Sequence, residues 1–115
     1  MRSICVGFSR DVVVEDLVAL LRGMNWHRVD SRLVVENGKA AVYLDIDMSE
    51  IDPADDWWLG SSLEGFPHAR VDVHVGRGGG SDRLAAEIVR RLVAFGGVVD
   101  PESDGLAALG SGSDE

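Results

Sequence analysis

The chain has 115 residues, of which 20 are acidic and 11 are basic, so its formal net charge is −9. This excess of acid argues against binding to the phosphate backbone of nucleic acids, and it favours either a basic partner or simple solubility. A length near that of one domain, together with 45% hydrophobic residues, predicts a single globular fold with its own core.

The cysteine content and the first apolar run indicate in which cellular compartment the protein works. Cys5 is the only cysteine, so no disulfide can form within the chain, and the apolar run around it predicts a buried thiol. Gly7 and Ser9 interrupt that run, which therefore resembles neither a signal peptide nor a membrane span. We expect a cytoplasmic protein that does not associate with a membrane.

The first elements in chain order are a strand over residues 3–8 and a helix that follows it. Ser9 or Asp11 is placed to cap this helix, and Gly23 is placed to end it. Apolar side chains recur at helical spacing at Val14, Leu17, Val18, Leu21 and Met24.

A hairpin is the clearest local prediction. Asn37-Gly38 lies between two β-rich runs, residues 32–36 and 39–47. Both turn residues tolerate positive φ, so the pattern predicts a two-residue type I′ turn that pairs Val35 with Ala40. The core-facing side would carry Leu33, Val35, Ala40, Val42, Leu44 and Ile46, and the other side would carry Arg32, Tyr43, Asp45 and Asp47.

A long connection over residues 48–68 precedes a run, residues 69–75, in which apolar and polar side chains alternate. The alternation predicts a strand that turns Val73 inward and turns Asp72 and His74 outward.

The last predicted elements are a second helix and a short strand. Ser81 is placed to cap a helix over residues 82–95, Gly96-Gly97 ends it, and Val98-Val99 can add an edge strand. On the exposed side of this helix, Glu87 is placed to pair with Arg90 or Arg91.

The order of elements is strand-helix-strand-strand-strand-helix-(strand). It predicts an α+β fold, namely a two-layer sandwich with a mostly antiparallel sheet and two helices on one face. Residues 1–100 would form the domain, and the acidic, Gly/Ser-rich residues 101–115 would form a tail.

Acidic residues concentrate between Ala40 and Ala69, where the sequence has no Lys or Arg. A negative stretch with aromatic side chains is more typical of a docking surface than of a catalytic pocket, and it favours a basic protein partner. For at least one tryptophan, the alternative is that it covers the edge of the core. The predicted partner-binding residues are Tyr43, Asp45, Asp47, Asp55, Asp56, Trp57, Trp58, Asp72 and His74.

One alternative is a small enzyme that binds acyl-coenzyme A or a phosphate ligand. The Gly-rich turn of residues 75–81 can cradle a phosphate with its backbone N–H groups, and it resembles the coenzyme-A loop of a family of acetyltransferases. The ligand would sit at Gly78–Ser81. Asp82 in the first helical turn would repel a pyrophosphate, so we expect a flexible linker there instead.

Other catalytic patterns are weaker. His74 beside Asp72 can serve as a general base with Asp45 or Asp47 near it, but a flat sheet face without a pocket favours simple surface decoration. No nucleophilic triad can be read from the sequence. The three histidines and one cysteine lack ligand spacing, so we expect no metal and no cofactor.

The C-terminal third carries a resemblance to a known family. Residues 84–92, followed by Phe95-Gly96-Gly97-Val98-Val99-Asp100, are similar to the closing helix-Gly-Gly-Val-Asp element of small bacterial immunity proteins from polymorphic toxin systems. The resemblance implies a cytoplasmic, non-enzymatic inhibitor that masks a toxin domain. An acidic surface suits that role because electrostatic steering speeds the capture of a basic toxin.

Overall fold

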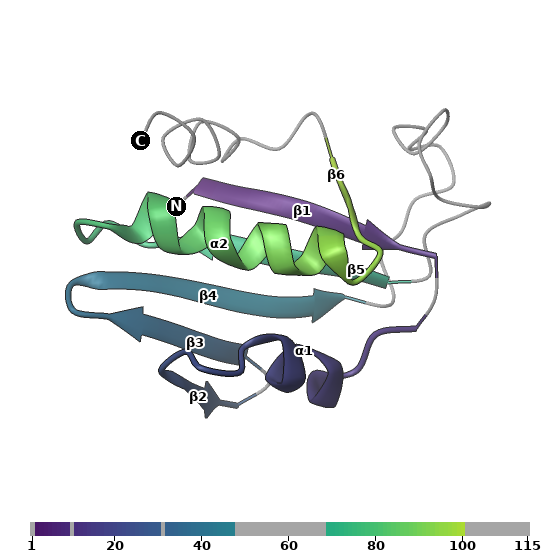
Figure 1. Ribbon diagram of the computed structural model, residues 1–115, viewed down its shortest axis with the longest axis horizontal. Coiled ribbons are helices and arrows are strands. Elements are labelled where there is room, and N and C mark those ends of the chain that lie inside the picture. The colour runs from purple at the N-terminus through teal and green to yellow at the C-terminus, as the bar shows by residue number, and fades with distance from the viewer. Residues whose placement is uncertain (1, 10, 31, 48–68, 101–115) are drawn as a thin grey trace.

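The strands of the chain assemble into one antiparallel sheet in a computed structural model, which describes residues 2–9, 11–30, 32–47 and 69–100. The sheet order is β2-β3-β4-β5-β1-β6, and two helices complete the α+β fold that the sequence predicts (Figure 1). The elements are β1 (Arg2–Phe8), α1 (Val14–Leu20), β2 (Trp26–Val29), β3 (Arg32–Asn37), β4 (Ala40–Asp47), β5 (Ala69–Val75), α2 (Ser81–Ala94) and β6 (Val98–Val99).

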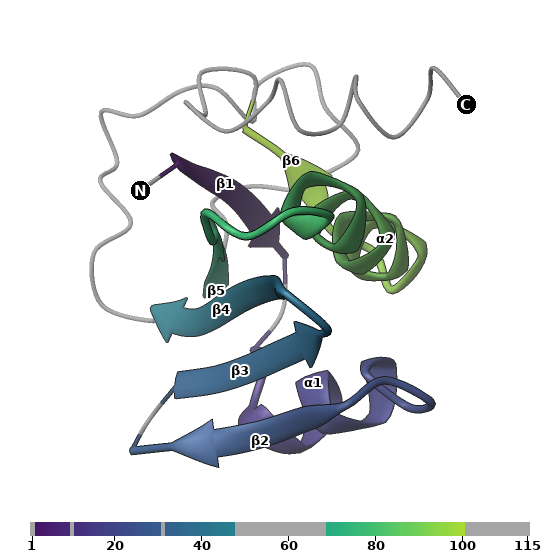
Figure 2. The ribbon, with the colours of Figure 1, turned by 90° about the vertical axis from the view of Figure 1, so that its left-hand side faces the viewer.

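The chain crosses the sheet twice, and both crossings lie on the same side (Figures 1 and 2). From β1 it passes through α1 to the far edge at β2, and the meander β2-β3-β4-β5 then returns to β1. α2 makes the second crossing, packs over β4, β5 and β1, and delivers β6 to the other side of β1. Neither of the two described helices lies on the opposite face of the sheet (Figure 2).

The helix-covered face of the sheet is aliphatic. On β5 the side chains alternate strictly between buried and half-buried, because successive side chains of a strand point to opposite faces. The buried set packs in one core with Leu17 of α1, Leu21 directly after α1, and Ile88 and Leu92 of α2. From the sheet, the core takes Ile4, Val6, Phe8, Leu33, Val35, Val42, Leu44, Ala69, Val71, Val73 and Val75.

The predicted hairpin forms, but its turn lies one residue further along the chain. Val35 lies opposite Val42 rather than opposite Ala40, and the loop residues are Gly38 and Lys39. Only the first of them has positive φ, at +63°, which fits a type II′ turn rather than the predicted type I′ turn. The pairing shifts by two residues, and an even shift leaves each side chain on its predicted face.

The start of α1 differs from the prediction. The helix begins after Val13, and the Asp16 carboxylate accepts a hydrogen bond from the Val13 backbone N–H at 3.0 Å. Neither Ser9 nor Asp11 therefore caps it. The strand β2 was also not predicted, and it adds a sixth strand at the edge of the sheet.

The Gly-rich turn before α2 packs against the β3–β4 hairpin. Ser81 is the first residue of α2 and not its cap, because its buried hydroxyl accepts a hydrogen bond from the backbone N–H of Ala41 at 3.0 Å. The Gly76 N–H donates to the Ala41 carbonyl, and a Cβ atom on Gly78 would lie 1.6 Å from the carbonyl oxygen of Lys39. This turn is thus a packed segment and not the flexible linker that the sequence suggests.

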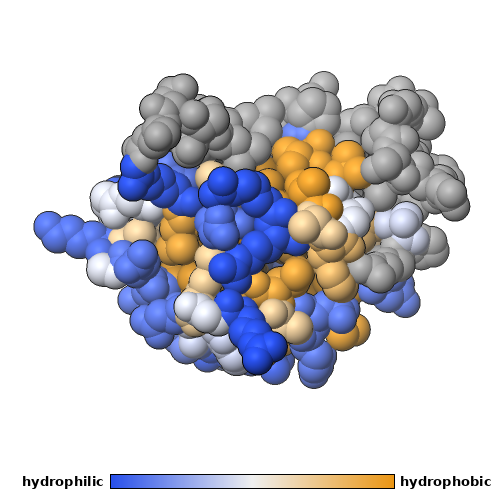
Figure 3. Space-filling view, viewed as in Figure 1, coloured by the Kyte–Doolittle hydropathy of each residue, from blue (hydrophilic) through white to orange (hydrophobic). Residues whose placement is uncertain are grey.

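α2 also holds α1 in place. The guanidinium of Arg91 donates to the backbone carbonyls of Leu20 and Arg22, each at 2.9 Å. Carbonyls at a helix C-terminus have no partner within the helix, so a cation there is stabilising. Glu87 pairs with both Arg90 and Arg91, as predicted. Hydrophilic and hydrophobic areas lie side by side on the helix-bearing side of the molecule (Figure 3).

Candidate functional site

The face of the sheet opposite the helices, which we call the outer face, carries four of the nine predicted partner-binding residues at described positions. Tyr43 on β4 lies opposite His74 on β5, and Asp45 lies opposite Asp72. Their side chains are half-buried rather than fully solvated, with exposed fractions of 30% for Asp45, 17% for Asp72 and 22% for His74.

The other five predicted residues cannot be placed in the site. Asp47 ends β4 opposite Arg70, but its side chain is not among the described ones. Asp55, Asp56, Trp57 and Trp58 lie in residues 48–68, outside the described part of the chain, as does the predicted tail of residues 101–115.

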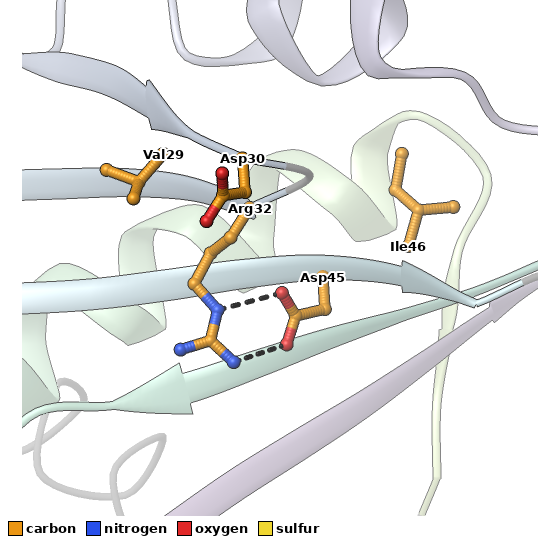
Figure 4. Close-up of a pocket in the computed structure, with 5 residues that line it drawn as sticks. All are labelled: Val29, Asp30, Arg32, Asp45 and Ile46. Atoms are coloured by element: carbon orange, nitrogen blue, oxygen red, sulfur yellow. Dashed lines mark hydrogen bonds and ion pairs between the residues drawn. The ribbon is translucent and has the colours of Figure 1, made fainter.

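Arg32 forms an ion pair on the outer face through two hydrogen bonds. Its Nε and Nη2 atoms donate to the two carboxylate oxygens of Asp45, both at 2.9 Å (Figure 4). The Arg32 guanidinium holds the pKa of Asp45 below its usual range, and a hydrogen bond from His74 acts in the same direction. The guanidinium carbon also lies 5.6 Å from the centre of the Tyr43 ring, within reach of a cation–π interaction.

His74 contacts both Asp45 and Ser3, a serine that was not among the predicted site residues. The distance from His74 Nε2 to Asp45 Oδ2 is 2.9 Å, and the distance from His74 Nδ1 to Ser3 Oγ is 2.7 Å. Ser3 lies 71 residues from His74 in sequence and meets it because β1 pairs with β5 in a register that sets the two residues opposite each other. Only the strand pairing reveals this contact.

Asp72 has its own partners. Its Oδ1 atom lies 3.1 Å from Arg70 Nε, and Cys5 lies opposite it on β1. Burial, together with a hydrogen bond and charge repulsion from Asp72, raises the pKa of the Cys5 thiol to about 12. Asp45 and Asp72 thus each lie against an arginine, so the described part of the outer face is more balanced in charge than the sequence suggests.

An open groove of about 450 Å³ lies at the end of this face, beside the turn between β2 and β3 (Figure 4). The Arg32–Asp45 ion pair lines it together with the aliphatic side chains of Val29 and Ile46. Asp30, which has a φ of +56°, adds a further carboxylate. Such a mixed lining suits the side chain of another protein better than an enclosed small molecule.

A second open groove, of about 520 Å³, lies over the Gly-rich turn and is lined by three arginines, Arg2, Arg77 and Arg83. Asp82, which we expected to repel a phosphate, is ion-paired with Arg2 of β1. The close approach of Gly78 to the hairpin explains this glycine by packing, without a ligand. The groove nevertheless has the charge that an anionic ligand needs.

Within the described ranges, no three His, Cys, Asp or Glu side chains lie close enough together to hold a metal ion. Neither described helix is long and apolar enough to cross a membrane. Comparisons with protein-family models, with curated proteins and with solved structures found no match to this chain.

Proposed function

We propose that this protein is a non-enzymatic protein-binding module, and most specifically an immunity-type inhibitor that masks a basic toxin domain. The observation that carries the proposal is the outer face, a broad sheet surface that neither helix covers and that carries paired polar side chains. An immunity role would place the chain in the cytoplasm of the cell that makes the toxin.

The distribution of charge supports a basic partner. Residues 48–68 and 101–115 hold nine of the 20 acids and no Lys or Arg, whereas the described residues hold ten of the 11 bases. Negative charge concentrated in two segments can steer a basic protein toward the domain over distances near the Debye length. The charge would then act mainly on the rate of association.

The ordered side chains of the outer face support a role in affinity. Tyrosine and arginine are enriched among residues that dominate binding energy, and Arg32 is already held by Asp45 and placed near Tyr43. Side chains fixed before binding lose less entropy when a partner docks. The proposed contact residues are Tyr43, Asp45, Asp47, Asp55, Asp56, Trp57, Trp58, Asp72 and His74.

The test measures the rates at which a basic toxin domain associates with and dissociates from this chain at several salt concentrations. We expect Asp55→Lys with Asp56→Lys to slow association about tenfold at low salt and to flatten its salt dependence. The matched control is Asp11→Lys with Glu15→Lys, which changes the net charge equally on exposed residues at the helix side. Equal rates for the two double variants would contradict electrostatic docking at this site.

The small-enzyme alternative rests on the arginine-lined groove over Gly78–Ser81. It predicts that acetyl-coenzyme A or inorganic phosphate binds the full chain and that Arg77→Ala weakens this binding. The docking proposal predicts no saturable binding of either compound in a calorimetric titration. The two functions are therefore separated by one experiment that does not involve the protein partner.

A further inference from the structure

We propose that Ser3 is a nucleophilic modification site that accepts an acyl or phosphonyl group from activated compounds, with His74 as its general base and Asp45 as the positioning residue. The proposal goes beyond the docking function and does not depend on it. It requires no turnover, because the transferred group stays on Ser3.

Four side chains from four neighbouring strands form one continuous chain of polar contacts. Ser3 on β1 contacts His74 on β5 at 2.7 Å, His74 contacts Asp45 on β4 at 2.9 Å, and Arg32 on β3 holds both oxygens of Asp45. A nucleophile within hydrogen-bond reach of a base, whose second nitrogen meets an orienting carboxylate, is the arrangement that activates a serine.

The charge of Asp45 decides which group donates in each contact. An ionised carboxylate can only accept, so His74 Nε2 must carry a proton and donate to Asp45. In the neutral imidazole the other nitrogen, Nδ1, then has a free lone pair. The Ser3 hydroxyl therefore donates to Nδ1, which is the arrangement that proton abstraction needs.

Arg32 keeps the arrangement in place. Its guanidinium favours the ionised form of Asp45 and fixes the carboxylate in one orientation through two hydrogen bonds. The serine and the imidazole remain accessible, since Ser3 is half-buried and the His74 side chain is 22% exposed.

Cys5 is a second potential nucleophile on the same strand, but no imidazole lies opposite it. It lies two residues from Ser3 on the same face, but it faces the carboxylate of Asp72, and its pKa is raised to about 12. A thiol with so high a pKa is largely protonated and unreactive at neutral pH. The structure thus favours reaction at the hydroxyl of Ser3 over reaction at the intrinsically more nucleophilic sulfur.

The proposed step balances for a fluorophosphonate. Ser3 Oγ attacks phosphorus, the new O–P bond forms, the P–F bond breaks, and fluoride leaves with the bonding electrons. The proton of Ser3 passes to His74 Nδ1 and from there to solvent. With an activated phenyl ester, Ser3 Oγ bonds to the carbonyl carbon, the bond from that carbon to the phenolic oxygen breaks, and the phenolate leaves with the bonding electrons. His74 can return the proton to the phenolate.

The first experiment labels the full chain with a fluorophosphonate and locates the adduct by peptide mass spectrometry. We expect the adduct on Ser3, no adduct there in Ser3→Ala, and labelling about 100-fold slower in His74→Gln. Ser9→Ala is the control serine, since Ser9 is exposed near the end of the same strand. His27→Gln is the control histidine, since His27 lies near Glu36, at 3.6 Å.

The pH dependence of labelling tests the wild-type chain without any variant. The groups that face His74 are Asp45 and Tyr43 from β4, Ser3 from β1, and its neighbour Asp72 on β5. Attack by Ser3 that is assisted by a neutral imidazole does not consume hydroxide, so the labelling rate should become independent of pH at alkaline pH. A labelling rate that rises tenfold with each pH unit up to pH 9 would mean that hydroxide, and not His74, removes the proton of Ser3, and it would overturn the proposal.

Asp45→Asn tests the positioning role. An asparagine amide can donate to Nε2, which moves the imidazole proton to Nδ1 and removes the acceptor for Ser3. We expect labelling to slow at least tenfold and the plateau of its pH profile to disappear, while the melting temperature stays within a few degrees of wild type. Labelling of Ser3 at an unchanged rate in both Asp45→Asn and His74→Gln would refute the inference.

Discussion

The two faces of the sheet are built from the same strands but are held together by different interactions. On the helix-covered face, Ile4, Val6 and Val73 are fully buried and belong to the apolar core. On the outer face, the neighbouring positions carry charged and hydroxyl groups that contact one another and remain partly exposed. The free energy of folding therefore comes mainly from the helix-covered face. Polar side chains on the outer face can serve recognition because their partly exposed contacts contribute little to stability.

The sharpest way to test this division is to truncate one aromatic side chain on each face. Phe8 is buried and packs edge-on against Phe95 with ring centres 6.0 Å apart. Phe8→Ala should lower the free energy of unfolding by about 3–5 kcal/mol, because it leaves a cavity in the core. Tyr43→Ala on the outer face should cost about 1 kcal/mol, since this side chain is only half-buried.

Urea unfolding of both variants measures the two losses in the free energy of unfolding. The dependence of that free energy on urea concentration is compared with that of wild type. If Tyr43→Ala lowered the free energy of unfolding as much as Phe8→Ala does, the outer face would be a second core. The two faces would then not differ in their contribution to stability.

The attachment of the helix layer can be tested at Gly78. A Cβ atom at this position would lie 1.6 Å from the Lys39 carbonyl oxygen, so Gly78→Ala must push the turn away from the hairpin. We expect a loss of about 1–3 kcal/mol in chemical denaturation. Gly79→Ala is the matched control, because its Cβ would meet nothing within 4 Å, and it should be neutral or slightly stabilising.

Arg91 tests the contact between the two helices. Arg91→Met keeps most of the stem but removes the hydrogen bonds to the Leu20 and Arg22 carbonyls at the end of α1. The expected loss is about 1–2 kcal/mol, and amide exchange should become faster in α1 than in α2. Arg90→Met, which removes only an exposed pair with Glu87, should cost less than about 0.5 kcal/mol.

The helix-covered face was readily predictable from the sequence. The alternation along residues 69–75 and the helical spacing in both helices place the apolar residues on one side, and the core confirms them. Even the misplaced hairpin turn left the faces unchanged, because side chains alternate with a period of two. The edge strand β2 was missed because Trp26-His27-Arg28-Val29 shows little alternation, and its pairing with β3 alone defines it.

For the outer face, the sequence predicted which residues point outward but not which residues contact one another. Outward positions such as Tyr43 and Asp45 follow from the alternation, but the partners of these residues do not. Ser3 reaches His74, and Arg2 reaches Asp82, because β1 lies beside β5 in the sheet order. That order depends on how the helices cross the sheet, which local patterns do not encode.

The smallest effect concerns the charge network of the outer face and its dependence on pH. Arg32 lowers the pKa of Asp45, so the folded state binds this proton less tightly than the unfolded chain does. The resulting stabilisation is complete above the ordinary carboxyl range near pH 4, and it is lost as the pH falls through the lower pKa of the folded state. Because the pair is partly exposed, we expect a contribution below about 1 kcal/mol.

Asp45→Asn should therefore be less stable than wild type in urea at pH 6.5, and the difference should shrink as the pH is lowered below 4. Asp11→Asn, an exposed site before α1, controls for the change in net charge. The opposite trend, with a difference that grows toward low pH, would mean that Asp45 is destabilising when ionised. Arg32 would then hold an unfavourable charge in place for recognition, and the outer face would be set up for binding at a direct cost to the fold.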